Sequence, residues 1–157
     1  MELVLWRHAE AAPGDPDAAR ALTDRGRRQA EEMARWLGPR LSRDLRMIVS
    51  PARRAQETAR ALGRSFETIE ALAPGGDVTS LLKLAGWPGA ERPVLVVGHQ
   101  PTLGETAAQL IDGRHASWHL GTCAVWWLRS RPRRGRGEAT LLLSIESEIL
   151  EREGSAS

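Results

Sequence analysis

Cysteine is nearly absent from this sequence, which removes disulfide bonds from the ways in which the chain could be stabilised. Cys123 is the only cysteine, so no disulfide can form within the chain. It lies in the apolar stretch 122–128, which predicts a buried core thiol rather than a nucleophile. A chain of 157 residues can bury a sizeable core and needs neither a disulfide nor a structural metal to fold.

Long apolar runs are also missing. No segment approaches the roughly 20 apolar residues that cross a membrane as a helix. Residues 1–7 have neither the basic start nor the extended apolar stretch of a secretory leader. We therefore expect a cytoplasmic protein that does not bind membranes.

Neither sign of charge dominates, because the formal net charge is only +2 at pH 7. This balance does not indicate a nucleic-acid-binding protein. Arginines do cluster between Arg129 and Arg136, where they could contact phosphate backbones or acidic partners. No recognition motif accompanies them, so we expect a solvated loop between two strands. Nucleic-acid binding is the least favoured alternative function.

The sequence does contain an alternation of short apolar runs and helical patterns. Strands are predicted in the runs 3–6, 47–49, 67–69 and 94–97, and a hairpin in the segments 122–128 and 139–146. Strands that alternate with helices predict a three-layer α/β/α sandwich with a mostly parallel central sheet. We expect one domain over residues 1–157, in which 149–157 form a flexible or helical tail.

Local signals mark where the helices begin and end. Thr23 and Asp77 are expected to be N-caps, and Gly38-Pro39 ends the first long helix. Ser50 is expected to cap a helix over residues 52–62, because Pro51 suits a first helical turn.

Histidine and arginine follow three of the predicted strands. Arg7-His8 follows the first, Arg54 lies in the segment after the second, and His99 follows the fourth. Ligands bind outside the carboxyl ends of the strands in an open α/β sheet, so these side chains are expected to converge.

Such a group of side chains suits a phosphoryl group. Guanidinium groups match phosphate oxygens and stay charged at any working pH. A neutral imidazole can attack phosphorus and carry it covalently. A second imidazole can stabilise the charge that spreads over the phosphoryl oxygens. No metal or other cofactor is then required.

The motifs resemble the histidine phosphatase superfamily, which has the phosphoglycerate mutase-like fold. The resemblance rests on Arg7-His8, on Ser50-Pro51-x-x-Arg54-Ala55-x-x-Thr58 and on Val97-Gly98-His99-x-Pro101. The segments 22–26 and 72–77 look like those of its SixA-type phosphohistidine phosphatases. The resemblance implies that His8 is the nucleophile, that Arg7 and Arg54 hold phosphate, and that His99 completes the pocket.

Two positions depart from the pattern of the family. Ala9 stands where the third residue of the first motif is usually glycine, and its β-carbon is expected to crowd the loop slightly. Ala71 stands where many members carry a glutamate as general acid, so Glu70 and Glu10 are the remaining candidates. A site without a dedicated acid should favour a P–N bond, because a protonated imidazole leaves more easily than an alkoxide.

Other motifs carry less weight. His115 and His119 have the i, i+4 spacing of a helical metal pair, but no cysteine or carboxylate with ligand spacing accompanies them. Gly75-Gly76 lacks the lysine and hydroxyl of a phosphate-binding loop and is expected to be a turn.

The favoured function is removal of phosphate from phosphohistidine in a protein, through a covalent phosphohistidine on His8 and without a metal. The chain is short and has no long insertion that could form a lid, so a protein side chain could enter the site. One alternative is hydrolysis of a small phosphomonoester by the same kind of site. Another is a module that binds phosphate or a phosphoprotein with little catalysis. We expect a monomer.

Overall fold

A computed structural model describes the backbone of residues 1–133 and 136–154 and the side chains of residues 1–130 and 139–152. Six strands of this part of the chain form one sheet in the order β3-β2-β4-β1-β5-β6. They are β1 (Glu2–Arg7), β2 (Arg46–Val49), β3 (Glu67–Thr68), β4 (Val94–Gly98), β5 (Val125–Arg133) and β6 (Arg136–Ile145). β1 to β4 run parallel, whereas β5 pairs antiparallel with both β1 and β6.

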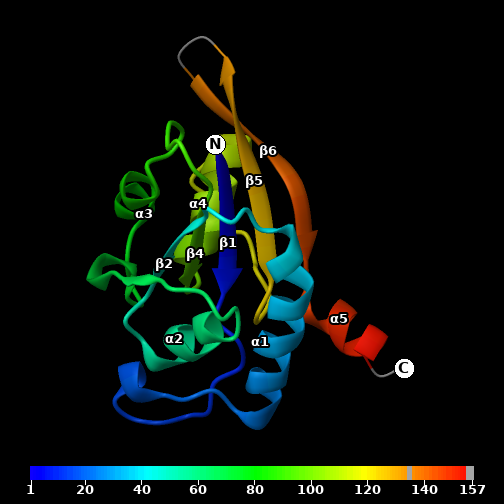
Figure 1. The fold of residues 1–157 in the computed structure, drawn as a ribbon. Coiled ribbons are helices and arrows are strands. Elements are labelled where there is room, and N and C mark those ends of the chain that lie inside the picture. Colours follow the sequence, from blue (N-terminus) through cyan, green and yellow to red (C-terminus); the bar gives the residue numbers. More distant parts are fainter. Residues whose placement is uncertain (134–135, 155–157) are drawn as a thin grey trace.

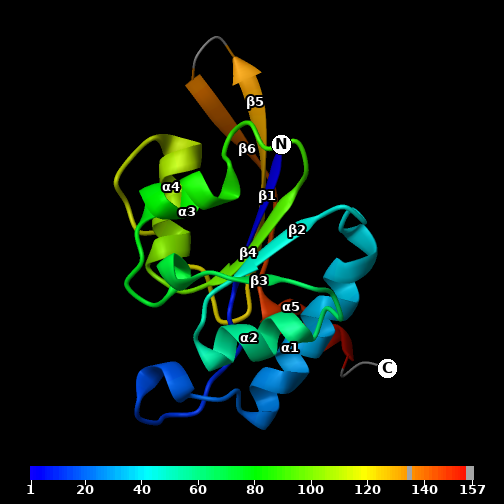
Figure 2. The same ribbon diagram turned by 60° about the vertical axis from the view of Figure 1, so that its left-hand side comes forward.

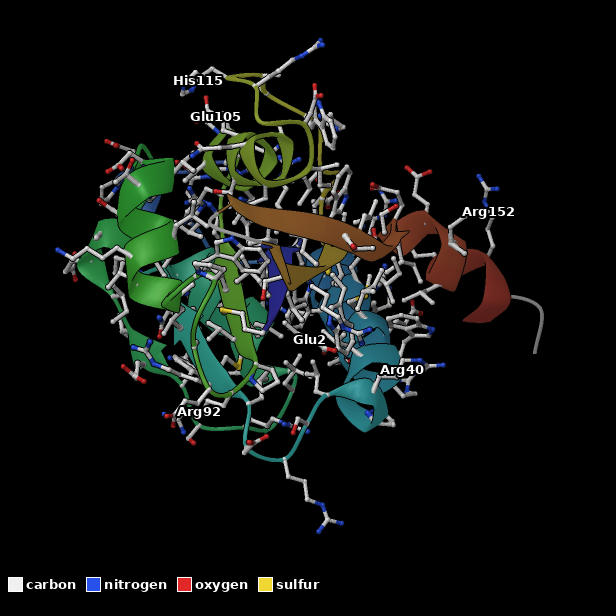
Figure 3. The ribbon with its side chains drawn as sticks, turned by 90° about the horizontal axis from the view of Figure 1, so that it is seen from above. Glu2, Arg40, Arg92, Glu105, His115 and Arg152 are labelled. Atoms are coloured by element: carbon white, nitrogen blue, oxygen red, sulfur yellow. The ribbon has the colours of Figure 1, made fainter. Side chains whose placement is uncertain are left out.

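Helices cover both faces of the sheet (Figures 1 and 2). They are α1 (Asp24–Leu37), α2 (Arg53–Arg60), α3 (Val78–Ala85), α4 (Thr102–Asp112) and α5 (Ser147–Gly154), with short 3₁₀ helices η1 (Asp17–Ala19), η2 (Gly38–Arg40) and η3 (Glu70–Leu72). Seen from above, α3 and α4 lie on one side of the strands and α1 and α5 on the other (Figure 3). The predicted three-layer sandwich with a mostly parallel sheet is confirmed.

The layers follow from the alternation of side chains along the strands. In β1, Val4 and Trp6 point into the core beneath α1, α2 and α5, whereas Leu3 and Leu5 point into the core beneath α3 and α4. β4 and the central residues 3–6 of β1 are apolar because both of their faces are covered.

The predicted caps of α1 and α3 are confirmed. The Thr23 hydroxyl accepts a hydrogen bond from the backbone N–H of Gly26, and the Asp77 carboxylate accepts one from the N–H of Ser80. Each side chain therefore satisfies an N–H that has no partner within its helix.

The hairpin at the end of the sheet is longer than the apolar pattern predicted. β5 continues to Arg133 and β6 begins at Arg136, so Arg129 to Arg133 lie on a strand rather than in a loop. Backbone pairing continues to Arg133–Arg136 because ladder hydrogen bonds do not require apolar side chains. Residue 134 lies outside the described residues.

The predicted tail is helical as far as Gly154, and residues 155–157 lie outside the described chain. Leu150 is buried in the core beneath α1, and Arg25 of α1 forms an ion pair with Glu151 at 3.1 Å. None of the helices in the described residues is long and apolar enough to cross a membrane.

Candidate active site

The side chains predicted to converge do meet at the carboxyl ends of three neighbouring strands. Arg7 ends β1, His99 follows β4, and Arg54 lies in the first turn of α2, which follows β2. The rings of His8 and His99 lie 5.1 Å apart, and Arg54 Nε donates to His8 Nε2 at 3.3 Å. Adjacent parallel strands bring together residues that are about 90 positions apart, since β4 pairs with both β1 and β2.

His8 has the hydrogen bonds of a neutral imidazole with its lone pair on Nε2. Nδ1 lies 2.8 Å from the carbonyl oxygen of Ala9, which can only accept, so Nδ1 carries the proton. Nε2 then accepts from Arg54. Burial, together with the positive charges of Arg54 and Arg7, lowers the pKa of His8 to about 4. The ring is therefore neutral at physiological pH.

His99 is held from its opposite side by Ser50. The Ser50 hydroxyl accepts from the N–H of Ala52 at 3.2 Å and lies 2.7 Å from His99 Nε2. Among the described contacts, Nε2 is the one acceptor within reach of the hydroxyl hydrogen, so we infer that Ser50 donates to Nε2 and that the ring proton lies on Nδ1. This Nδ1 is buried and makes no hydrogen bond to any described residue. Burial lowers the pKa of His99 to about 3, so this ring is also neutral at physiological pH.

This role of Ser50 corrects the prediction that it caps α2. The N-cap is Ala52, which has no side-chain hydrogen bond to the helix. The Ser50 hydroxyl bonds the N–H just before the helix instead, and it is fully buried against His99.

The two arginines are held in different ways. Arg7 donates from Nη1 to the carbonyl oxygen of Leu120 at 2.7 Å. The Arg54 side chain is only 5% exposed and donates to the backbone oxygen and the carboxylate of Asp17, at 2.9 and 3.0 Å. Its neighbour Arg53 is exposed and pairs with Glu57 at 2.7 Å.

Ala9 fits the loop that carries His8. Its side chain is fully buried, its N–H donates to the Thr58 hydroxyl at 3.0 Å, and its φ is not positive. The backbone here does not need glycine, so the expected crowding is absent from this loop. Glycine is needed instead at Gly26, where a β-carbon would lie 2.0 Å from the carbonyl oxygen of Glu10.

The two candidate acids have different surroundings. The Glu10 carboxylate accepts from the Thr23 hydroxyl at 2.7 Å and pairs with Arg25 at 3.4 Å. Glu70 and Ala71 lie in η3, and Glu70 is exposed. Neither carboxylate makes a hydrogen bond to His8 or His99 in the described residues.

Two further side chains at this site were not predicted. Asp17 bridges Arg54 and Arg20, and Arg20 Nη1 donates to its Oδ1 at 2.9 Å. The only signal in the sequence was the i, i+3 spacing of opposite charges in the loop after His8, which is common on ordinary surfaces.

The histidine pair considered for a metal does not lie on a helix. α4 ends at Asp112, so residues 115–119 are irregular and the i, i+4 spacing does not align the two side chains. His115 lines a cavity with Glu105 (Figure 3), whereas His119 lines a different cavity with Glu10. No cluster of three or more metal-ligating side chains occurs among the described residues.

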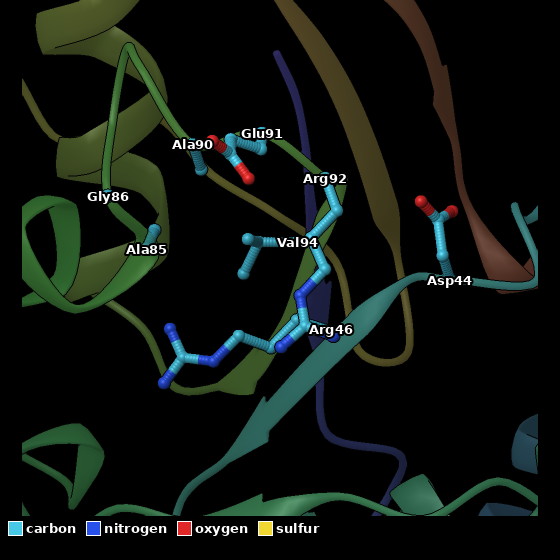
Figure 4. A pocket seen from close by; sticks show the side chains of 8 residues that line it. All are labelled: Asp44, Arg46, Ala85, Gly86, Ala90, Glu91, Arg92 and Val94. Atoms are coloured by element: carbon cyan, nitrogen blue, oxygen red, sulfur yellow. The ribbon is translucent and has the colours of Figure 1, made fainter.

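A cavity of about 520 Å³ lies at the other end of the sheet (Figure 4). Arg46 and Val94, which begin β2 and β4, line it, so it is remote from the two histidines. The Arg46 guanidinium is occupied by Glu67 and by the carbonyl oxygen of Leu84. This cavity therefore lies outside the candidate active site.

Comparison with known proteins places the chain among phosphatases. The histidine phosphatase superfamily (branch 1) matches residues 3–73. The phosphohistidine phosphatase SixA of Escherichia coli is 32% identical over 123 aligned positions, and the match covers 72% of this chain and 76% of that protein. A SixA homolog of Haemophilus influenzae is 33% identical over 131 aligned positions, and the match covers 73% of this chain and 80% of that protein.

A solved structure shows the same fold over nearly the whole chain. The protein histidine phosphatase SixA, complexed with tungstate, superimposes with a TM-score of 0.78 at 29% identity and covers 96% of this chain and 99% of that one. The chain belongs to the histidine phosphatase superfamily and is a phosphatase of its SixA type.

Proposed function

We propose that this phosphatase hydrolyses phosphohistidine in a protein substrate, with His8 as the nucleophile. The observation that carries the proposal is the tautomer of His8. The Ala9 carbonyl holds the proton on Nδ1, which leaves the Nε2 lone pair facing the Arg54 guanidinium, beside the ring of His99. The similarity to SixA supports the substrate class.

The proposed reaction has two displacements at phosphorus. In the first, His8 Nε2 forms a bond to phosphorus and the bond to the substrate imidazole breaks, and that imidazole leaves as a neutral ring after taking a proton. In the second, water forms the new P–O bond, His8 Nε2 receives the electrons of the P–N bond, and phosphate leaves with the oxygen of the water.

Positive charge from the protein would stabilise both transition states. Arg7 and Arg54 would hold the phosphoryl oxygens, and the Nδ1–H of His99 would also donate to one of these oxygens. We propose that no metal ion takes part, because these groups supply the charge that a metal would otherwise bring.

The surroundings of Glu10 and Glu70 are consistent with a substrate that has a P–N bond. Glu10 is held by Thr23 and Arg25 at the start of α1, and Glu70 is exposed on η3. We propose that neither is required as a proton donor, because an imidazole leaving group can be protonated before it departs.

The experiment measures phosphate release from a phosphohistidine peptide in excess chelator. We expect release by the wild type, its loss in His8→Ala, and little change in the control His115→Ala, whose side chain is exposed. A phosphoenzyme trapped by rapid quench on the wild type, and missing from His8→Ala, would identify the intermediate.

Other outcomes contradict particular parts of the proposal. Loss of activity in chelator that a divalent metal restores would contradict the metal-free mechanism. Faster release from a simple alkyl phosphate, with collapse in Glu70→Gln, would favour a phosphomonoesterase. Phosphate binding without any turnover would indicate a binding module.

A further inference from the structure

Asp17 holds two arginines at the mouth of the site with one carboxylate. Its Oδ2 accepts from Arg54 Nη2 at 3.0 Å, and its Oδ1 accepts from Arg20 Nη1 at 2.9 Å. The side chain of Asp17 is 56% exposed, whereas that of Arg54 is 5% exposed. Figure 2 shows η1, which begins with Asp17, beside α2 beyond the carboxyl ends of the parallel strands.

The Asp17 carboxylate competes with any phosphoryl group for Arg54. Arg54 Nε contacts His8 Nε2, Nη1 donates to the backbone oxygen of Asp17, and Nη2 donates to its carboxylate. Guanidinium groups bind carboxylate and phosphate through the same forked donors. Each Nη carries two hydrogens, so a phosphoryl group on His8 can also reach Arg54 beside Asp17, but it gains the Nη2 hydrogen that the carboxylate holds only if Asp17 gives it up.

Arg20 is positioned to bind the phosphoryl group once that group has displaced the Asp17 carboxylate. Its Nε donates to the carbonyl oxygen of Ala12 at 2.8 Å, which fixes the guanidinium independently of Asp17. Its charge also contributes to the low pKa of His8, so the guanidinium lies within electrostatic reach of that ring. Two oxygens of one carboxylate now join Arg20 to Arg54, and two oxygens of one phosphoryl group can do the same.

We propose that Asp17 occupies the position of the substrate's phosphoryl oxygens in the free enzyme, and that Arg20 becomes a third phosphate-binding arginine when the phosphoryl group displaces this carboxylate. The inference rests on the proposed function, because it assumes that phosphate binds between His8 and Arg54. It adds Asp17 and Arg20 to the residues that set phosphate affinity.

The test measures the affinity of the full chain for inorganic orthophosphate by calorimetry. Asp17→Asn removes the competing charge, so we expect phosphate to bind roughly three- to tenfold more tightly. Arg20→Gln removes a charge-assisted hydrogen bond to phosphate, so we expect binding about tenfold weaker. The double variant Asp17→Asn/Arg20→Gln keeps the net charge and should bind about tenfold more weakly than Asp17→Asn alone.

The chain offers a matched control pair. Asp24 and Arg27 form an ion pair at 3.1 Å with the same i, i+3 spacing, and Asp24 is far more exposed than Asp17. Arg27 also donates to a backbone carbonyl, as Arg20 does. Asp24→Asn, Arg27→Gln and their double variant should change phosphate affinity less than twofold. Thermal unfolding of every variant checks that it is folded.

Each result either supports the inference or overturns part of it. Unchanged or weaker phosphate binding in Asp17→Asn shows that Asp17 merely supports Arg54 and overturns its role as a competitor. Equal affinities of Asp17→Asn and the double variant overturn the role of Arg20, even if Arg20→Gln alone is unstable. If the wild type binds no orthophosphate, the inference is wrong as a whole.

Failure of the inference can be told apart from failure of the proposed function. Hydrolysis of phosphohistidine by the wild type, with phosphate affinity independent of residues 17 and 20, overturns only the inference. Phosphate binding that depends on Arg54, Arg20 and Asp17, without hydrolysis of phosphohistidine, overturns only the proposed function.

Discussion

At the scale of single residues, the site depends on the protonation of two buried imidazoles. The carbonyl of Ala9 and the hydroxyl of Ser50 leave the proton on Nδ1 in both rings, so His8 keeps a lone pair on Nε2 beside Arg54, whereas His99 keeps an Nδ1–H that has no partner among the described residues. The roles proposed for these rings, attack and oxyanion stabilisation, require this difference.

The first prediction concerns the titration of His8. Its folded pKa of about 4 means that the nucleophilic, neutral form is present above that pH and is lost as the pH falls through it. An NMR titration of the imidazole protons, assigned with His8→Asn, should show no change near pH 6.5 and a midpoint near 4. A midpoint close to the ordinary histidine value would contradict the burial and tautomer argued here.

The second prediction concerns Ser50. Ser50→Ala removes the hydroxyl that fixes the His99 tautomer. It also leaves the buried backbone N–H of Ala52 without a hydrogen bond, which costs about 1–3 kcal/mol of stability. We expect kcat to fall about tenfold, because His99 loses its orientation.

Ser130 provides the control, because it is also buried and hydrogen-bonded but belongs to β5, where it contacts Met1 and Pro88. Ser130→Ala should lower the melting temperature without lowering kcat. An equal loss of kcat in both variants would mean that Ser50 is only structural.

At the scale of elements, the site depends on how closely α1 approaches the loop after His8. Thr23 caps α1 and its hydroxyl also donates to Glu10. Gln29 of α1 accepts from the N–H of Glu10 at 3.1 Å. The first turns of α1 therefore fix the backbone two residues after His8.

The third prediction follows from Gly26. A β-carbon there would lie 2.0 Å from the carbonyl oxygen of Glu10, so Gly26→Ala must separate α1 from the loop. We expect a loss of roughly 1–3 kcal/mol in urea unfolding, together with weaker phosphate binding. Gly89→Ala is the control, since nothing lies within 4 Å of its added β-carbon. A stable, fully active Gly26→Ala would show that this contact is not required.

At the scale of the whole molecule, the two core layers share a single sheet. Alternate side chains of β1 and β4 contribute to both cores, so neither layer can lose its packing alone. We propose that the chain is one domain, which agrees with its length and predicts a single unfolding transition with coincident fluorescence and circular dichroism midpoints.

The fourth prediction is a loss of stability in mild acid. An unfolded imidazole binds a proton below about pH 6.5, whereas folding lowers the pKa of His8 to about 4 and that of His99 to about 3. The unfolded state therefore binds more protons in this window, so the free energy of unfolding decreases as the pH falls from 6.5 to 4. His8→Asn should show a shallower decrease than the wild type, and identical slopes would contradict the prediction.

The alternating fold, and the convergence of Arg7, His8, Arg54 and His99 at one edge of the sheet, could be predicted from the sequence. Buried parallel strands are apolar runs, and ligand-binding residues follow their carboxyl ends, so both leave local patterns that can be read along the chain. The caps at Thr23 and Asp77 could be read for the same reason, since a cap acts on a helix only a few residues away.

The hydrogen bonds that hold those four side chains, and the other residues that join them, could be seen only in the tertiary structure. The bonds of Ser50 to His99, of Arg7 to the carbonyl of Leu120, and of Asp17 to Arg54 each join segments at least 37 positions apart. Nothing in the local sequence of either partner requires such a bond. The strand lengths of the arginine-rich hairpin were likewise set by backbone pairing, which polar side chains neither signal nor prevent.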